Sequence, residues 1–475
     1  MALTPQLSPK PRVLIVGGGY AGLYVAKNLE KQVKARGGVV TIVDPLPYMT
    51  YQPFLPEVVG GHIEPRHAVV DRRTHLKASE HVIGKVVKVE HARKTATVQT
   101  EDGTEFEIPY QDIVMTAGAT TRTFPIPGLA EAGIGLKAIE EAEALRNQIL
   151  ERIEAASTMT DAEEKRRALT FVVVGGGFAG IETIAEMEDI IRATIAKNPR
   201  LAQSDARIVL VEAMGRIMPE VSEDQALGVV DHLKTRGIEV LLNTSLSSAE
   251  DNLMKLINMQ DKSDAGEFYA DTLVWTAGVA ANGVAKKTDF PVEERGRIEV
   301  TPTLQVSDGD GGVLEGAWGC GDVCAVPDLT GAGPGGFCVP NAQHAGRQAK
   351  RLAANLLAVR FGEGPVEEYV HKSLGAVAGF GVGKGVGNPL GVKISGLPAW
   401  LAHRGYHVMA MPMFERKARI FTGWVNELVW GRDTTAVENL DRPHNAFLEA
   451  AGGEPQVGRF EKKAIGQKAE KALSN

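Results

Sequence analysis

A glycine cluster after the first apolar run of the chain carries the clearest chemical signal. Gly17, Gly19 and Gly22 have the spacing G-x-G-x-x-G directly after residues 13–16, and a helical stretch begins near Tyr20. In such a loop the first glycine permits a tight turn, the second lets a pyrophosphate approach the backbone, and the third lets helix and strand pack closely. Free N–H groups and the helix dipole hold the negative charge. The spacing predicts a dinucleotide site.

An acidic residue ends the next apolar run. Asp44 follows residues 39–43 and stands 22 positions after Gly22. A carboxylate there can accept hydrogen bonds from ribose hydroxyls. The glycine motif alone would also fit a simple tight turn, but strand, loop, helix, strand and acid together are typical of a nucleotide-binding β-α-β unit.

The same pattern occurs a second time. Gly175, Gly177 and Gly180 follow another apolar run and open another helical stretch, and Glu212 ends the next strand. A carboxylate at that position repels a 2′-phosphate and favours NADH over NADPH, although Arg216, four positions on, could accept that phosphate. Two dinucleotide sites indicate two cofactors brought together, as hydride transfer from a nicotinamide to a flavin requires.

Each copy closes with a similar strand and glycine. Residues 113–117 lead to Gly118, and residues 273–277 lead to Gly278. The repetition predicts an α/β fold with two Rossmann-like dinucleotide-binding domains. Residues 82–108 contain short β-rich runs between polar turns, which suggest a small antiparallel element.

Composition excludes several classes of protein. The 475 residues are 44% apolar and 23% charged, which is ordinary for a globular chain and not for a fibre or a mainly disordered protein. The net charge of -7 gives no support to a nucleic-acid partner. Cys320, Cys324 and Cys338 are the three cysteines; they cannot form a disulfide framework, and no signal peptide precedes them, so we expect a reducing cytoplasm.

Residues 12–358 resemble the flavoproteins that have two dinucleotide-binding domains. That resemblance implies FAD at the N-terminal loop and NADH at the second loop, with Gly118 and Ala342 among the FAD-binding residues and Gly278 among the NAD-binding residues. The segment 319–322 fits the superfamily's late Gly-Asp motif, so Gly321 and Asp322 would contact FAD, Asp322 at the ribityl chain. Disulfide reductases of this superfamily carry a redox cysteine pair, which the corresponding residues 48–56 lack. Thiol relay chemistry is therefore not expected.

Within the superfamily the chain is similar to the type II NADH dehydrogenases. Glu182 follows the second loop much as a glutamate does in that family, and Ala342-Gln343 begins a stretch similar to its Ala-Gln-x-Ala quinone motif. A second glutamine, Gln348, stands one position later than the usual spacing, so we favour Gln343 over it. Residues 395–401 resemble the family's membrane-proximal segment.

The resemblance gives several residues a role. Asn341 is a good helix N-cap, and the helix from about Ala342 would point its positive end at the pyrimidine edge of the flavin. Gln343 would face the flavin or a quinone carbonyl. Glu182 would contact the nicotinamide or control proton movement, although a first-turn carboxylate also simply compensates the helix dipole. Gln52 would lie beside the isoalloxazine, or only form a turn.

The implied function is an FAD-dependent NADH:quinone oxidoreductase that acts on menaquinone or ubiquinone. It needs no metal, and it does not pump protons because no channel-forming spans exist. We expect a peripheral protein on the cytoplasmic face of the cell membrane, with a homodimer as one option. Two alternatives remain: a soluble NAD(P)H-dependent reductase of a ferredoxin-like protein, and a non-enzymatic NADH-binding redox sensor.

The C-terminal region has the composition of a lipid-binding surface. Three of the five tryptophans lie between residues 397 and 431, and residues 371–432 hold eight basic and two acidic side chains. An interfacial helix attracted by anionic lipid would look like this. The expected apolar face holds Ile420, Phe421, Trp424, Val425 and Leu428, and the polar face holds Thr422, Asn426 and Glu427. Alternatively, the apolar face packs on the protein's own core or on a second subunit.

These observations predict a division of the chain into five parts. They are residues 11–125, the first part of the FAD-binding domain; 126–295, an inserted NAD-binding domain; 296–360, the second part of the FAD-binding domain; 361–453, a membrane-associating region; and 454–475, a flexible tail.

Overall fold

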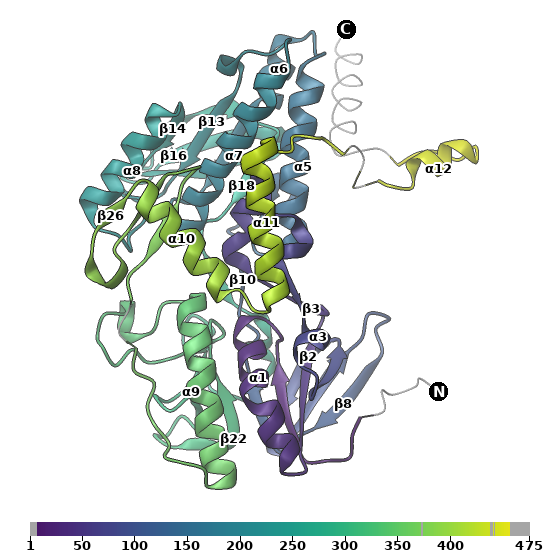
Figure 1. Ribbon diagram of the computed structural model, residues 1–475, viewed down its shortest axis with the longest axis vertical. Helices are drawn as coiled ribbons and strands as arrows, with labels where there is room; N and C mark the ends of the chain where they lie inside the picture. The colour runs from purple at the N-terminus through teal and green to yellow at the C-terminus, as the bar shows by residue number, and fades with distance from the viewer. Residues whose placement is uncertain (1–6, 372–373, 438–439, 441, 457–475) are drawn as a thin grey trace.

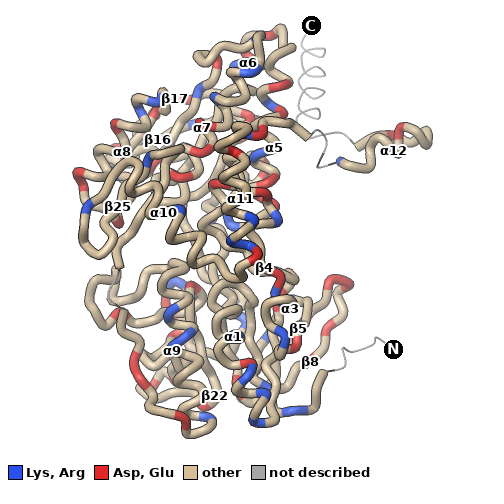
Figure 2. Tube along the Cα trace, viewed as in Figure 1, with Lys and Arg blue, Asp and Glu red and all other residues tan. Residues whose placement is uncertain are grey.

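The computed structural model describes residues 7–371, 374–437, 440 and 442–456 (Figure 1). Lys372 and most of the predicted tail lie outside these residues. Figure 1 shows two lobes, one built on each of the two main sheets, with α10 and α11 lying in front of the upper lobe and α12 extending to the side. In the view of Figure 2, basic and acidic residues are interspersed over both lobes.

The lower lobe contains a six-stranded sheet. Its order is β21 (Gln305–Ser307), β22 (Val313–Gly319), β9 (Asp112–Met115), β1 (Arg12–Val16), β2 (Val39–Asp44) and β5 (Glu80–Ile83). All pairings are parallel except that of β21 with β22. Every residue of β1 is buried, as its uninterrupted apolar run predicts for a central parallel strand. Helices α1 (Tyr20–Ala35) and α9 (Ala342–Phe361) pack against each other beside this sheet.

The upper lobe repeats this plan with a five-stranded parallel sheet. Its order is β11 (Gly133–Ile134), β18 (Thr272–Trp275), β12 (Thr170–Val174), β13 (Arg207–Val211) and β14 (Ile238–Leu241). The associated helices are α5 (Ile139–Ala156), α6 (Ala162–Ala168), α7 (Phe178–Lys197) and α8 (Glu223–Thr235). The two Rossmann-like folds expected from the repeated motif are therefore present.

Each lobe also carries a three-stranded antiparallel sheet. One consists of β6 (Lys85–Glu90), β7 (Thr95–Gln99) and β8 (Glu105–Pro109), as residues 82–108 suggest, and the other of β15 (Thr244–Ser248), β16 (Leu253–Asn258) and β17 (Asp264–Tyr269). The lobes are joined by β10 (Ala119–Thr121) and β19 (Val279–Ala281), which pair antiparallel. These two strands follow Gly118 and Gly278, so the closing glycine of each copy begins a crossover.

Short elements complete the lobes. They are β3 (Tyr48–Thr50), β4 (Val69–Asp71), α2 (Leu55–Val59), α3 (Arg72–His75), α4 (Leu129–Ala132), β20 (Ile298–Glu299) and β23 (Cys324–Ala325). The C-terminal region adds β24 (Val377–Gly379), β25 (Gly385–Gly387), β26 (Ile394–Ser395), α10 (Leu397–Ala410), α11 (Phe414–Trp430) and α12 (Asn445–Ala450). Among the described helices, none has both the length and the apolar character needed to cross a membrane.

The inner face of α11 mixes apolar and charged residues. Ile420 is fully buried, the Trp424 indole N–H donates to Glu57 at 2.7 Å, and Glu427 contacts the buried ring of His62. These three α11 residues recur at i, i+4 and i+7, which is one stripe of a helix. The expectation that Glu427 lies on a polar face away from Ile420 and Trp424 is therefore wrong. A buried histidine compensates its charge, so it can face inward.

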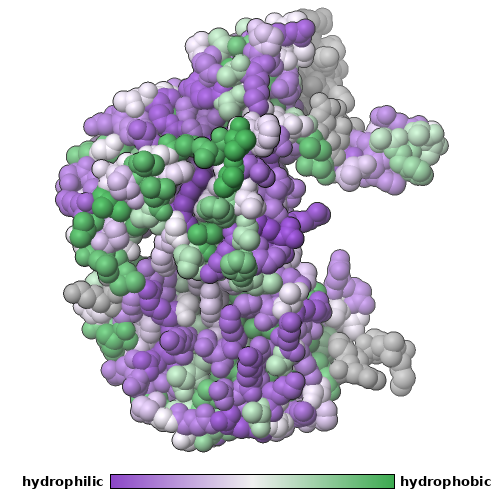
Figure 3. Space-filling view, in the orientation of Figure 1, coloured by the Kyte–Doolittle hydropathy of each residue, from purple (hydrophilic) through white to green (hydrophobic). Residues whose placement is uncertain are grey.

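The outer face of α11 is apolar. Phe414, Phe421, Leu428 and Trp430 are 84%, 59%, 87% and 84% exposed, and Val425 is also exposed. The predicted apolar face is thus divided between the protein and the solvent. Figure 3 shows hydrophobic residues along the exposed side of the C-terminal helices.

The basic residues of the C-terminal region are not all at the surface. Arg404 is buried beside Glu57, with 3.4 Å between guanidinium and carboxylate, and the largely covered side chain of Arg432 lies 3.7 Å from Glu186. Counting charges along residues 371–432 therefore overstates the positive charge offered to a lipid surface. The reason is that the compensating carboxylates come from distant segments of the chain.

Candidate functional site

The first glycine loop has the shape that a pyrophosphate site requires. Gly17 adopts a left-handed conformation with φ +98°, and a Cβ on Gly22 would lie 1.9 Å from the Gly17 carbonyl oxygen. Both positions therefore demand glycine. A Cβ on Gly19 would meet no atom within 4 Å. The middle glycine faces open space in front of the N-terminus of α1, where a phosphate can approach the backbone.

Asp44 is fixed at the end of β2. Its Oδ2 accepts from the Gly18 N–H at 2.7 Å, and its Oδ1 accepts from the Leu46 N–H at 2.8 Å. The guanidinium of Arg72 lies 3.4 Å away and is almost fully buried. The Asp44 carboxylate therefore holds the glycine loop through its hydrogen bond to the Gly18 backbone. Arg72, which the sequence analysis did not single out, supplies a buried positive charge behind the loop.

A cavity of about 220 Å³ begins at this loop. Seven of the nine residues predicted to bind FAD line it: Gly19, Asp44, Gln52, Gly118, Gly321, Asp322 and Ala342. The other two, Gly17 and Gly22, shape the loop from behind. The cavity runs from Asp44 to the N-terminus of α9, past Asp322. The cavity therefore connects the glycine loop to the N-terminus of α9, the two ends between which a dinucleotide would lie.

Two further residues, Lys137 in the first cavity and Gln348 beside it, contact or support the Gly-Asp turn. Lys137 lines the cavity beside Asp322; burial lowers the pKa of this lysine while Asp322 and Glu141 raise it. Burial raises the pKa of Asp322, and Lys137 opposes that shift. Gln348 is buried, and its Oε1 accepts from the Gly321 N–H at 2.8 Å. The glutamine with unusual spacing therefore supports the Gly-Asp turn.

The second glycine loop repeats the geometry of the first. Gly175 has φ +114°, a Cβ on Gly180 would lie 1.8 Å from the Gly175 carbonyl oxygen, and Gly177 faces open space. Glu212 accepts from the Gly176 N–H at 2.5 Å, as Asp44 does from Gly18. Gly278 follows β18 with φ +103°, in the position that Gly118 holds in the first copy.

The side chain of Arg216 does not face the Glu212 carboxylate. Its guanidinium donates to the carbonyl of Val221, on the turn that precedes α8. A 2′-phosphate at the end of β13 would therefore meet Glu212 without a free arginine partner. This arrangement favours NADH over NADPH.

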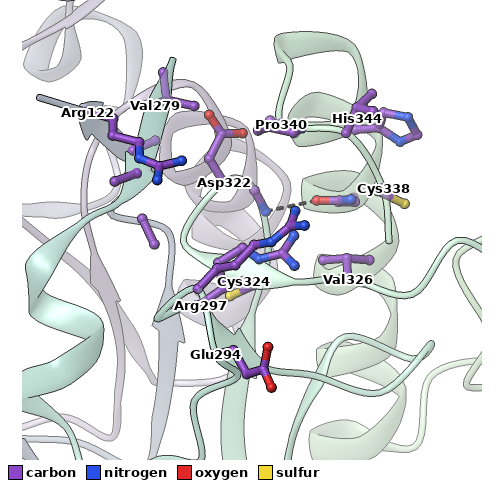
Figure 4. A pocket seen from close by; sticks show the side chains of 18 residues that line it. Arg122, Val279, Glu294, Arg297, Asp322, Cys324, Val326, Cys338, Pro340 and His344 are labelled. Atoms are coloured by element: carbon purple, nitrogen blue, oxygen red, sulfur yellow. Dashed lines mark hydrogen bonds between the residues drawn. The ribbon is translucent and has the colours of Figure 1, made fainter. Parts of the chain in front are cut away.

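A second cavity, of about 650 Å³, lies on the other side of Asp322 (Figure 4). Three arginines, Arg122, Arg295 and Arg297, line it together with the crossover strands β10 and β19. It shares Gly321 and Asp322 with the first cavity. The two cavities therefore adjoin at the Gly-Asp turn. The three arginines of the second cavity outnumber its two carboxylates, Glu294 and Asp322, and can meet a phosphate-bearing molecule.

The two residues predicted to take part in catalysis lie apart from these cavities. The Oε1 of Gln343 lies 3.1 Å from the Nε2 of His371, and Gln343 lines neither cavity although its neighbours Ala342 and His344 do. Glu182, in the first turn of α7, lies 3.0 Å from His403 of α10. Glu182 lines a small cavity together with Pro53, and Pro53 also lines the first cavity. Pro53 therefore contacts both the small cavity that Glu182 lines and the cavity in which the flavin is expected.

The cysteines do not form a redox pair. Cys320 and Cys324 are buried in and after the Gly-Asp turn, and burial raises the pKa of both thiols. Cys338 is only partly buried, and its Sγ donates to the Pro327 carbonyl. Thiols held in the protonated form are poor nucleophiles. This agrees with the expectation that the protein does not use thiol relay chemistry.

The comparisons with known proteins agree with this site. Residues 11–349 match the model of the family described as pyridine nucleotide-disulphide oxidoreductase. The chain is 27% identical to the type II NADH:quinone oxidoreductase NdhA of Mycobacterium tuberculosis, over 87% of this chain and 86% of the relative. It is 26% identical to the type II NADH:quinone oxidoreductase of Staphylococcus epidermidis, over 82% of this chain and 92% of the relative.

A solved structure has the same fold. The structure of NDH2 from Plasmodium falciparum in complex with NADH aligns with a TM-score of 0.82 at 18% sequence identity, over 90% of this chain and 100% of that chain. The resemblance to type II NADH dehydrogenases deduced from the sequence is thus confirmed. Since the family model covers well over half of the chain, the protein belongs to the pyridine nucleotide-disulphide oxidoreductase family.

Proposed function

We propose that the protein is an NADH:quinone oxidoreductase that contains FAD. The observation that carries the proposal is the pair of glycine loops, each closed by a strand-end carboxylate and each open at its middle glycine. Both relatives named above are NADH:quinone oxidoreductases. The absence of a cysteine pair beside the first cavity argues against a disulfide substrate.

The residues of the first cavity fit FAD. The open cradle at Gly19 would take the pyrophosphate, Asp44 a ribose, and Asp322 the ribityl chain. When bound, FAD accepts a hydride from NADH and passes electrons to the second substrate. Asn341 caps α9 by accepting from the His344 N–H at 2.7 Å. The positive end of that helix lies at Ala342, where it would stabilise negative charge on the flavin.

NADH would bind at the second glycine loop with its ribose on Glu212. The positively lined second cavity lies between the crossover strands and Asp322, and we assign to it the approach of the nicotinamide half to the flavin. Placing nicotinamide and flavin in contact is the protein's main task, because proximity alone can remove several kcal/mol of barrier.

The electron acceptor would be menaquinone or ubiquinone in the lipid bilayer, reached from the cytoplasmic face. The outer residues of α10 and α11 support a lipid-facing surface, because Leu397, Leu401, Met409, Phe421 and Leu428 are all more than half exposed. An apolar surface of this kind on a helix pair is typical of an interfacial anchor. The region would rest on the membrane without crossing it.

An acceptor panel tests the reaction. Purified protein is given NADH or NADPH together with a short-chain ubiquinone, a menaquinone analogue or a ferredoxin. We expect fast turnover with NADH and a quinone only. Turnover with the ferredoxin alone would establish the soluble-reductase alternative, and no turnover with any acceptor would favour the redox sensor.

A liposome assay tests the lipid surface. The test variant, Phe421→Ser/Leu428→Ser, replaces two exposed apolar side chains of α11 by polar ones. The control variant, Leu227→Ser, does the same to an exposed apolar side chain of α8. The first variant should no longer float with anionic liposomes while keeping FAD, and the second should behave as wild type. Flotation by both would contradict the proposed surface; a dimer that turns monomeric in the first variant would identify a subunit interface instead.

A further inference from the structure

Glu182 is paired with a buried histidine. Its Oε1 lies 3.0 Å from the Nε2 of His403 and accepts from the Gly379 N–H at 3.2 Å. The residues come from α7, β24 and α10, so the contact joins the NAD lobe helix α7 to the C-terminal region, about 200 positions later in the chain. His403 is 5% exposed. A carboxylate and an imidazole held together out of water can share a proton.

A second histidine extends this pair toward the first cavity. His407, one turn after His403 on α10, has its ring centroid 4.5 Å from that of His403, in an edge-on arrangement. Its Nδ1 lies 3.1 Å from the hydroxyl of Tyr51. The Tyr51 ring packs against Tyr20, which lines the first cavity. Glu182–His403 and His407–Tyr51 are thus within hydrogen-bond distance, ring contacts join His403 to His407 and Tyr51 to Tyr20, and the row of side chains ends at the wall of the expected flavin site.

The reaction needs such a supply of protons. NADH delivers one hydrogen with two electrons, whereas a quinol carries two hydrogens more than its quinone. The overall reaction is therefore NADH + H⁺ + quinone → NAD⁺ + quinol, and one proton per turnover must come from the solvent. Positioned acid–base side chains can deliver that proton to the reacting group.

We propose that His403 stores the proton that quinone reduction takes from solvent, and that His407 and Tyr51 relay it to the edge of the flavin cavity. The inference rests on the proposed quinone reaction. In the step the N–H bond of His403 breaks, an O–H bond of the quinol forms, and a solvent proton later restores the imidazolium. No electrons pass through the histidines. Glu182 positions the ring and holds its positive charge.

The electrostatic surroundings of His403 fit this role. Burial alone lowers its pKa, but the carboxylate of Glu182 outweighs burial and raises it, with help from Glu57 of α2, whereas Arg404 on its own helix opposes the rise. His407 has a pKa well below the usual value because of burial and the neighbouring His403. The paired carboxylate of Glu182 therefore favours the protonated form of the first ring, and burial disfavours the protonated form of the second.

Stopped-flow kinetics of the FAD-loaded protein can test the relay. The variants are His403→Gln and Tyr51→Phe, with His75→Gln, a histidine next to Lys27 on the surface of the FAD lobe, as the control. Bleaching of the flavin by NADH and its reoxidation by a soluble quinone analogue are measured separately, across pH and in H₂O and D₂O. Positioned acid–base groups contribute about 100-fold or more to such steps.

We expect His403→Gln to slow reoxidation about 100-fold, to flatten its pH profile and to leave bleaching within about twofold of wild type. Tyr51→Phe, which keeps the packing of the ring, should slow reoxidation in the same direction and lower the solvent isotope effect. If His403→Gln fails to retain FAD, the reoxidation rate and solvent isotope effect of Tyr51→Phe test the relay instead.

Two results would overturn the relay. One is reoxidation at the wild-type rate with the wild-type pH profile in both variants; the other is an equal loss in both half-reactions, which indicates a packing role. Failure of the proposed function would look different, since wild-type flavin would then not be reoxidised by quinone at all.

Discussion

Replacing the middle glycine of one loop by alanine should weaken binding at that nucleotide site and leave the other site unchanged. A Cβ at Gly19 or at Gly177 meets no protein atom within 4 Å, and neither residue has a positive φ. Alanine should therefore fold in either position. In the loaded protein, however, the methyl would occupy the space that lets a pyrophosphate reach the backbone N–H groups.

The expected loss of affinity follows from the hydrogen bonds between the backbone and the pyrophosphate. A hydrogen bond to a charged group is worth about 1.5–3 kcal/mol, so losing one weakens binding by roughly 10- to 150-fold. Gly19→Ala should lose FAD by that factor and keep its NADH affinity, and Gly177→Ala should do the reverse. Flavin fluorescence gives FAD release, and titration of the holoprotein gives NADH affinity.

A third variant makes this test specific. Gly22→Ala would place its Cβ 1.9 Å from the Gly17 carbonyl oxygen, so it should lower the thermal stability of the lobe as well as FAD binding. If Gly19→Ala binds FAD as tightly as wild type, or if Gly177→Ala releases FAD, the assignment of the two loops is refuted.

Three further outcomes can be measured. Glu212→Arg should shift the preference toward NADPH in steady-state assays, because it replaces the carboxylate that repels a 2′-phosphate; unchanged preference would contradict the site. Gln343→Leu should spare flavin bleaching and slow reoxidation by quinone in stopped flow, and equal losses would mean that this glutamine mainly supports FAD. Burial alone lowers the pKa of His62, but Glu186 and Glu427 outweigh it and raise the pKa from 6.5 to about 9. Such a rise corresponds to about 3 kcal/mol of stability, which is present below pH 6.5 and lost as the pH rises through about 9. His62→Gln should thus be less stable than wild type at pH 6, with the gap narrowing toward pH 10; a constant gap in denaturant titrations would contradict the charge argument.

The nucleotide loops could be predicted from sequence because their physics is local. The tight turn at Gly17, the close packing at Gly22 and the carboxylate of Asp44 all lie within one β-α-β unit, where spacing determines geometry. The same holds for Glu212 in the second copy. The Asn341 cap is equally local, and the helix begins where its side chain predicts.

The residues that could not be predicted from the sequence contact residues that lie far away in the chain. Gln348 supports Gly321 from another element, and its unusual spacing told against it although the helix brings it to the turn. Arg72, Lys137 and His403 carry no motif. Only the folded chain shows that Arg72 lies behind the glycine loop, Lys137 near Asp322 and His403 against Glu182.

The faces of α11 show a second limit of sequence patterns. Hydrophobic periodicity cannot distinguish an apolar side chain that meets protein from one that meets lipid, so Ile420 and Phe421 were assigned to one face. Charge counting has the same weakness. Arg404 is paired with Glu57, which lies more than 340 positions earlier in the chain, and no local count records such a pair.

The central claim is that one chain passes a hydride from NADH to bound FAD and then electrons to a quinone. Its most direct test is an anaerobic double-mixing experiment on the purified protein. NADH is added in equal amount to the flavin, and a soluble quinone analogue follows. We expect NADH to bleach the flavin fully and the quinone to restore its absorbance with formation of one quinol per NADH. A flavin that bleaches but stays reduced in the presence of quinone would contradict the account.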